Sequence, residues 1–226
     1  MLIRPAYKDT EDDDEAATNS LSRQAYQRIR DLIVTLQLAP GALVNEADLK
    51  EDLQLGRTPI REALQRLACE GLVVLRPHRG AFVAGLSIVD LQQIFELRRS
   101  LEGYAAGLAA ERATPADIAA MRAALAGLEA AEPGAGPEIY ITIDQAFHRA
   151  LARGAHNRFL ENTLSRMYNL NLRLWYMALD KIGPMRQAID EHQRVLAAIV
   201  QRDGPRAEAA MREHITGFQN RIRGLL

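Results

Sequence analysis

Cysteine is almost missing from this chain: Cys69 is the only one among 226 residues, so no internal disulfide can form. A fold without disulfides suits a reducing compartment, and we expect a cytoplasmic protein. No apolar run approaches the roughly 20 residues that a membrane helix needs. The segment Met1–Tyr7 lacks the apolar core of a signal peptide, so we expect none. These absences argue against disulfide scaffolds and membrane proteins.

A large net charge is also missing, because 28 basic and 29 acidic side chains nearly cancel. The charges are unevenly spread along the chain. Residues 1–19 carry two basic and six acidic side chains, and we expect a disordered acidic leader there. Residues 20–86 carry nine basic and seven acidic side chains, which is only a weak sign of nucleic-acid binding. Whether this segment is predicted to bind nucleic acid therefore depends on how its basic residues are arranged.

Residues 20–84 have the pattern of a small DNA-binding domain. Apolar spacings of three and four predict a helix over residues 20–36, a short second helix and a third helix over residues 57–70. The β-prone runs LVVL and AFVA follow, and the turn residues between them predict a hairpin. Three helices and a hairpin predict a winged helix-turn-helix.

Residues 85–226 are predicted to be entirely helical. Glycine and proline pairs interrupt the pattern and leave about six helices, which predict an antiparallel bundle with its own core. The expected fold is thus mainly α, with a winged helix-turn-helix followed by an all-α domain.

The stretch GRTPIREALQRL separates into two faces. Its apolar residues form one stripe, while Arg57, Thr58 and Arg61 lie on the other side of the first turn and a half. Recognition helices read base edges with such amino-terminal residues, and arginine offers two donors to guanine. Arginines on an amphipathic helix can also be plain surface charges. The tight turn before this helix and the basic hairpin after it favour DNA binding.

The same stretch resembles the DNA-binding domain of the GntR family of bacterial transcription regulators. The shared motifs are PG after the first helix, RTPIREAL, EGL and a wing ending in RG. The resemblance implies DNA contacts from Arg57, Thr58, Arg61 and the wing tip, whose residues are His78, Arg79 and Gly80. Gly56 departs from the family's usual serine, so a phosphate contact from that hydroxyl should be absent.

Histidine is scarce, and three of the five histidines could meet in the helical half. In DQAFH, Asp144 and His148 are four residues apart and share a helix face. His192 and His214 lie on two later helices that a Gly-Pro turn makes antiparallel. Three imidazoles and one carboxylate suit a divalent first-row metal ion. Alternatively, the histidines are unrelated and are satisfied by water and backbone.

Three neighbouring residues are expected to lie outside any such site. Glu191 and Glu213 precede two of the histidines, but adjacent helical residues point about 100° apart. We expect both to be surface charges and not ligands or a general base. His156 stands beside a helix break and is expected in a loop.

The helical half resembles the effector domain, called FCD, of the FadR-type branch of the GntR family. Asp144, Phe147 and His148, the later Glu191-His192 and His214 match its signature, as does the opening ELRRSLE. The resemblance implies that Asp144, His148, His192 and His214 bind a divalent ion, with zinc or nickel favoured and manganese or iron as other candidates. The number of helices places the chain near the VanR-like group.

Members with this signature usually bind a small organic acid, and we expect a small carboxylate effector here. Arg98 is a candidate anchor for it, with a surface arginine as the alternative. Polar and aromatic residues on a later helix are further candidates to line the effector pocket: Tyr168, Asn169, Asn171, Arg173, Trp175 and Tyr176.

The expected function is that of a bacterial, nucleoid-associated repressor that binds a short palindromic DNA operator as a homodimer. Two other functions stay open. The metal could be purely structural, with DNA binding unregulated. A histidine-carboxylate site with open positions could also belong to a hydrolase tethered to DNA. A ligand that changes DNA affinity would favour the regulated repressor over the protein with a structural metal. Turnover of an ester or amide would favour the hydrolase.

Overall fold

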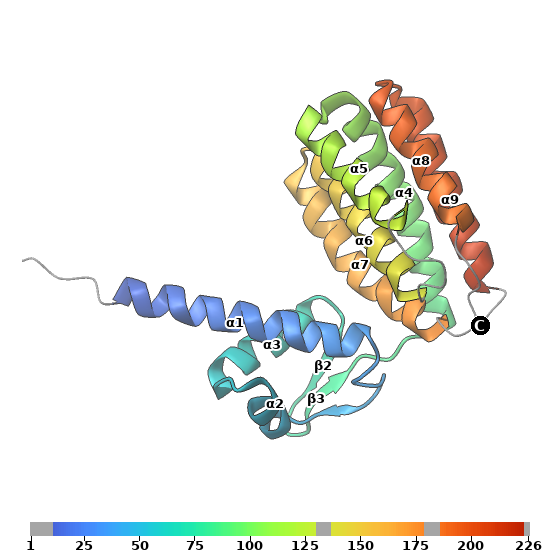
Figure 1. The fold of residues 1–226 in the computed structure, drawn as a ribbon. Helices are drawn as coiled ribbons and strands as arrows, with labels where there is room; N and C mark the ends of the chain where they lie inside the picture. Colours follow the sequence, from blue (N-terminus) through green and yellow to red (C-terminus); the bar gives the residue numbers. More distant parts are fainter. Residues whose placement is uncertain (1–10, 130–136, 179–185, 224–226) are drawn as a thin grey trace, which may run out of the picture. The chain divides into compact units, whose positions relative to one another are not determined.

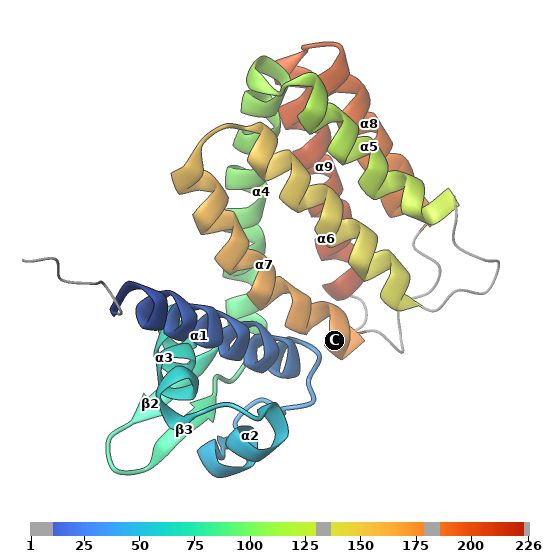
Figure 2. The same cartoon turned by 60° about the vertical axis from the view of Figure 1, so that its left-hand side comes forward.

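The computed structural model describes residues 11–129, 137–178 and 186–223, and they form two compact units, Met1–Gly85 and Leu86–Leu226 (Figures 1 and 2). The predicted combination of a winged helix-turn-helix and an all-helical domain is confirmed. No helix in the described ranges is long and apolar enough to cross a membrane.

The first unit contains three helices and a small antiparallel sheet. Its elements are α1 (Glu11–Val34), β1 (Leu43–Val44), α2 (Glu46–Leu53), α3 (Arg57–Cys69), β2 (Val73–Arg76) and β3 (Gly80–Val83). Strand β3 pairs with both others, in the order β1-β3-β2. The two-residue strand β1 was not predicted, because so short a run carries no alternation of its own.

The core of this unit joins the apolar faces of the helices to the sheet. Helix α1 contributes Ile29 and Ile33, and α3 contributes Ile60, Leu64 and Leu67, all of which are buried. The apolar stripe predicted for α3 is therefore the face that packs inward. Burial of that stripe directs the opposite side of α3 toward solvent.

The beginning of α1 differs from expectation. The helix starts at Glu11, so residues 11–19 of the expected disordered leader are helical. Alanine and glutamate have high helix propensity, and acidic residues favour the positive amino end of a helix. Residues 1–10 lie outside the described residues.

The second unit is built from six helices in the described residues. They are α4 (Ile88–Arg112), α5 (Pro115–Glu129), α6 (Pro137–Gly154), α7 (Arg158–Ala178), α8 (Arg186–Val200) and α9 (Gly204–Arg223). A capping box formed by Ser87 and Asp90 begins α4. Helix α4 packs most extensively against α9. A Cβ at Gly103 of α4 would lie 2.9 Å from Cγ of Arg212 on α9, which is too close, so glycine at this position allows the approach. This packing brings α6, α8 and α9 around one buried polar centre.

Candidate metal centre and nucleic-acid interface

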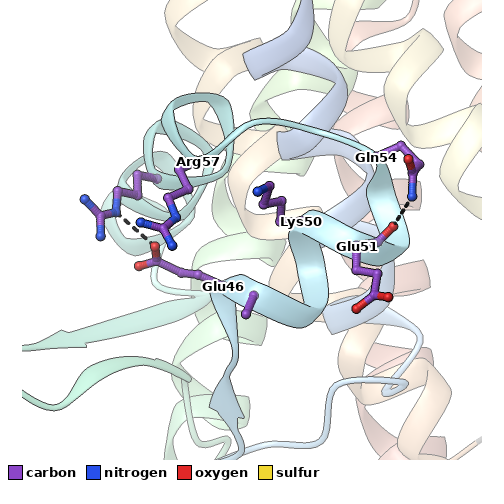
Figure 3. A pocket seen from close by; sticks show the side chains of 7 residues that line it. Glu46, Lys50, Glu51, Gln54 and Arg57 are labelled. Carbon is purple, nitrogen blue, oxygen red and sulfur yellow. Dashed lines mark hydrogen bonds and ion pairs between the residues drawn. The ribbon is translucent and has the colours of Figure 1, made fainter.

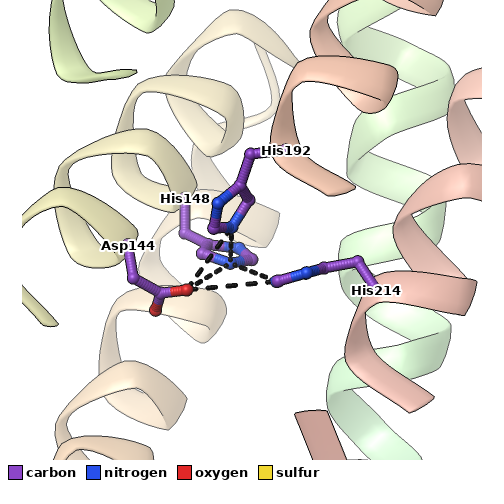
Figure 4. Close-up of side chains that lie close together, drawn as sticks. All are labelled: Asp144, His148, His192 and His214. Carbon is purple, nitrogen blue, oxygen red and sulfur yellow. Dashed lines mark hydrogen bonds and ion pairs between the residues drawn. The ribbon is translucent and has the colours of Figure 1, made fainter. Parts of the chain in front are cut away.

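The four predicted ligands lie together in the interior of the helical unit (Figure 4). Asp144 and His148 come from α6, His192 from α8 and His214 from α9, and all four are buried. One ligand atom from each lies within 4.8 Å of the others. The alternative of three unrelated histidines is therefore wrong.

The ligand atoms are separated by distances typical of groups around one ion. Nε2 of His148 lies 3.2 Å from Nε2 of His192 and 3.2 Å from Nε2 of His214. Oδ1 of Asp144 lies 3.4 Å from Nε2 of both His148 and His192, and 3.9 Å from that of His214. Metal–ligand bonds of about 2.0–2.2 Å place neighbouring ligands roughly 3–3.5 Å apart.

Two buried carboxylates orient the rings from behind. Nδ1 of His148 forms an ion pair with Glu102, and Nδ1 of His214 lies 2.9 Å from Oε2 of Glu191. A carboxylate at Nδ1 keeps the proton on that nitrogen, so the neutral ring directs its Nε2 lone pair inward. The two lone pairs then face one another and the Asp144 carboxylate. Such a group of acceptors needs a shared cation or an added proton, and this chemistry fits a metal ion.

Glu191 corrects one expectation. It was predicted to be a surface charge, but it is buried and accepts hydrogen bonds from Arg221 as well as contacting His214. Although Glu191 points about 100° away from His192 on α8, helix α9 covers that direction. Glu213 is 73% exposed, as expected for a surface charge.

Glu102 was missed as a site residue, although it belongs to the ELRRSLE motif. Its only visible signal was its position four residues after Arg98, which predicts an ion pair on one helix face. That pair exists, with 2.5 Å between Arg98 Nε and Glu102 Oε1. The contact with His148 depends on how α4 packs against α6, which helical periodicity does not specify.

The protonation states in the histidine cluster depend on burial and on the neighbouring charges. Burial would lower the pKa of His148, but the carboxylates of Glu102 and Asp144 outweigh it and raise the pKa to about 9. Burial would raise the pKa of Glu102, but Arg98 and His148 hold it at about 2. Burial and repulsion from His192 lower the pKa of His214 to about 3. Without an ion, the centre at neutral pH thus contains a protonated His148 among ionised carboxylates.

Ion binding should therefore release a proton. The raised pKa of His148 means that chelated protein holds this proton at pH 7 and loses it only near pH 9. A divalent ion has to displace it, so we expect about one proton released per chain at pH 7 and about tenfold tighter apparent binding per pH unit up to that pKa. Calorimetric titration in buffers of different protonation enthalpy measures the release. Binding without any proton release would contradict the assignment of His148.

Arg98 is not a surface arginine. Its side chain is 1% exposed, and Nη1 has no hydrogen-bond partner within the described part of the chain. It also shares Glu102 with Tyr168, whose hydroxyl donates to Oε2 at 3.1 Å. Of the polar run on α7, Tyr168, Asn169, Asn171, Arg173 and Trp175 are buried, and Tyr176 is partly exposed. Arg98 therefore has a buried donor without a partner among the described residues, on a side chain that is linked to the histidine cluster through Glu102 and His148.

His156 lies outside the cluster, as predicted. It follows α6 in a turn, is 48% exposed, and places Nε2 2.8 Å from Oδ2 of Asp117. It is a suitable control residue for any test of metal binding.

The first unit presents the predicted DNA contacts on its surface. Arg57, Thr58 and Arg61 are exposed at the start of α3, where Figure 3 shows a hollow between this helix and α2. Gly56 is the N-cap and provides no side-chain hydrogen bond, as expected for glycine in place of serine.

The hairpin tip is also exposed. His78, Arg79 and Gly80 lie there, and the left-handed φ of 60° at His78 and 93° at Gly80 turn the chain between β2 and β3. All six predicted DNA-contacting residues are thus accessible to a nucleic acid.

Both halves of the chain match known protein families. The family described as bacterial regulatory proteins, gntR family, matches residues 21–83, and the FCD domain matches residues 93–217. The transcriptional repressor RspR of Escherichia coli K12 is 26% identical over 91% of this chain and 90% of its own. The regulator LutR of Bacillus subtilis is 29% identical, over 83% and 94%. The Uxu operon transcriptional regulator of E. coli K12 is 30% identical, over 86% and 83%.

A solved structure agrees on the fold. The E. coli protein McbR/YncC superposes with a TM-score of 0.81 at 24% identity, covering 90% of this chain and 97% of its own. The matched families and these relatives are transcription regulators, so the chain is not a hydrolase. The two family matches, which cover the winged DNA-binding half and the helical half, place this chain in the GntR family of bacterial regulatory proteins, with an FCD domain.

Proposed function

We propose that this chain is a repressor whose affinity for its operator is controlled by a small carboxylate bound at a divalent ion in the FCD domain. The observation that supports it is the convergence of four acceptor atoms, from Asp144, His148, His192 and His214, at one buried point. Two relatives of the chain, RspR and GlaR, are named as repressors.

The ion would be held by three imidazoles and one carboxylate, a donor set that suits zinc or nickel and also allows manganese or iron. An ion that accepts five or six ligands offers a remaining position to a carboxylate oxygen. Arg98, with its available Nη1, is the proposed second anchor for the same small acid. The charge of a guanidinium and its paired donors suit a carboxylate.

The DNA-binding unit would act in a homodimer. A two-fold protein reads a two-fold site, so the proposed operator is a short palindrome with one α3 in each half-site. Arg57, Thr58 and Arg61 are the proposed contacts from α3, and His78, Arg79 and Gly80 those from the wing.

Replacing Arg61 tests this assignment. In Arg61→Ala, we expect specific binding to weaken by about 1–3 kcal/mol, with sequence preference lost at one symmetric base position per half-site. Selection of duplexes from a random library by wild type and variant measures both effects. An unchanged sequence preference would remove Arg61 from the readout.

A purely structural ion remains the second candidate function, because ligands as deeply buried as His148 and His214 also suit a site that stabilises the fold. In that case the ion would raise thermal stability, and no carboxylate bound to it would change operator affinity.

A further inference from the structure

Arg61 is held in place by an acidic residue from a different helix. Its Nε donates to Oε2 of Glu46 at 2.9 Å. Glu46, which is labelled in Figure 3, is the first residue of α2. The side chains are 64% and 36% exposed. Exposed ion pairs contribute about 0–1 kcal/mol to stability, so this pair does little to hold α2 against α3. Helices α2 and α3 pack against each other directly, and each has buried apolar residues, such as Leu53 and Ile60.

The pair does constrain how Arg61 can meet a base. A guanidinium has five N–H donors in a rigid plane, and Glu46 engages the one on Nε. The donors on Nη1 and Nη2 remain, and they form the end-on fork that can meet O6 and N7 of guanine together. An arginine held in one orientation before binding also loses less side-chain freedom when DNA arrives.

The position of the pair supports this role. Glu46 and Arg61 line two adjoining hollows on this face of the unit. Lys50 and Arg57 line the first, beside α2, and Arg76 and His78 line the second, beside the wing. Basic side chains that can meet phosphates thus lie on both sides, with the Glu46–Arg61 pair between them.

We propose that Glu46 is a positioning residue for DNA readout, which orients Arg61 toward a guanine and so increases sequence discrimination. This inference rests on the proposed role of Arg61. An acidic residue on a DNA-binding face repels phosphate, so Glu46 should weaken non-specific binding while it improves specific binding. Discrimination and overall affinity should therefore change separately when Glu46 is replaced.

The test compares Glu46→Gln with Glu51→Gln in the full chain. Glu51 is on the same helix and lines the first hollow, so its replacement removes the same charge without touching the Arg61 contact. Each variant is titrated with the palindromic duplex selected by wild type, with the same duplex carrying adenine at the position read by Arg61, and with mixed-sequence DNA.

We expect Glu46→Gln to reduce the ratio of affinities for the first two duplexes by about three- to tenfold. Its affinity for mixed-sequence DNA should stay equal or rise. Glu51→Gln should leave the ratio unchanged. An unchanged ratio in Glu46→Gln would overturn the inference, provided that Arg61→Ala binds the first two duplexes with equal affinity. If Arg61→Ala keeps the ratio, the proposed readout by Arg61 fails, and the positioning role with it.

A second measurement does not need DNA. In the free protein, NMR relaxation of the Arg61 Nε–H should show an ordered group in wild type and a mobile one in Glu46→Gln. Equal mobility in both proteins would also overturn the positioning role.

Discussion

Alanine at His192 or His214 should abolish the stabilisation that a divalent ion gives to this protein. An ion present at 100–1,000 times its dissociation constant adds about 2.7–4.1 kcal/mol to the free energy of unfolding. For a chain of this size, that corresponds to a rise of about 5–16 °C in the midpoint of thermal unfolding. Each variant lacks one of four ligand atoms that lie within 4.8 Å of one another in wild type. The ion-dependent rise should then largely disappear.

The measurement is a thermal melt of chelated and ion-loaded protein, with metal content determined on the same samples. We expect close to one ion per chain in wild type. The matched control is His156→Ala, because His156 is exposed and contacts Asp117 instead of the cluster. A large loss of metal in that variant, or wild type that binds no divalent ion at micromolar concentration, would refute the proposed site.

A small carboxylate that binds at the ion should weaken operator binding about 5–150-fold, the range that coupling of about 1–3 kcal/mol produces. An effector changes DNA affinity only through a difference in its affinity for the two states of the protein. The route along the chain is short, since α4 begins at Ile88 and β3 of the wing ends at Val83. Arg98 and Glu102 of the same helix α4 reach the cluster through His148.

A screen of small organic acids by thermal shift, with metal present, should identify such a ligand. Its effect on operator binding should be nearly absent in His148→Ala, which loses an ion ligand and the contact with Glu102. Arg98→Ala is the complementary variant: it keeps all four ion ligands but lacks the proposed second anchor. Full release of the operator in His148→Ala would place the effector elsewhere.

The residues that could be predicted from the sequence are those whose role depends on spacing within one helix. The apolar stripe of α3 and the pair formed by Asp144 and His148 follow from helical periodicity alone. The meeting of His192 and His214 needed one further step, that a short turn makes two helices antiparallel. Spacing alone left open that the histidines were unrelated, and the resemblance to the FCD domain favoured the shared site.

The residues that were misjudged depend on packing between helices. Glu191 was assigned to the surface by its angle on α8, yet α9 covers that direction and supplies His214 and Arg221. Glu102, which was not assigned to the site, likewise has a partner on another helix, His148 of α6. Periodicity gives the direction of a side chain but not the neighbour it meets.

The most direct test is one titration of the protein–operator complex with the carboxylate found in the screen. It is performed on ion-loaded wild type and repeated on chelated wild type, with binding of the carboxylate measured in parallel. The account predicts that the carboxylate releases the operator from ion-loaded protein and has little effect after chelation. If the carboxylate binds at the ion while operator affinity stays constant, the ion is structural and the regulatory function is contradicted.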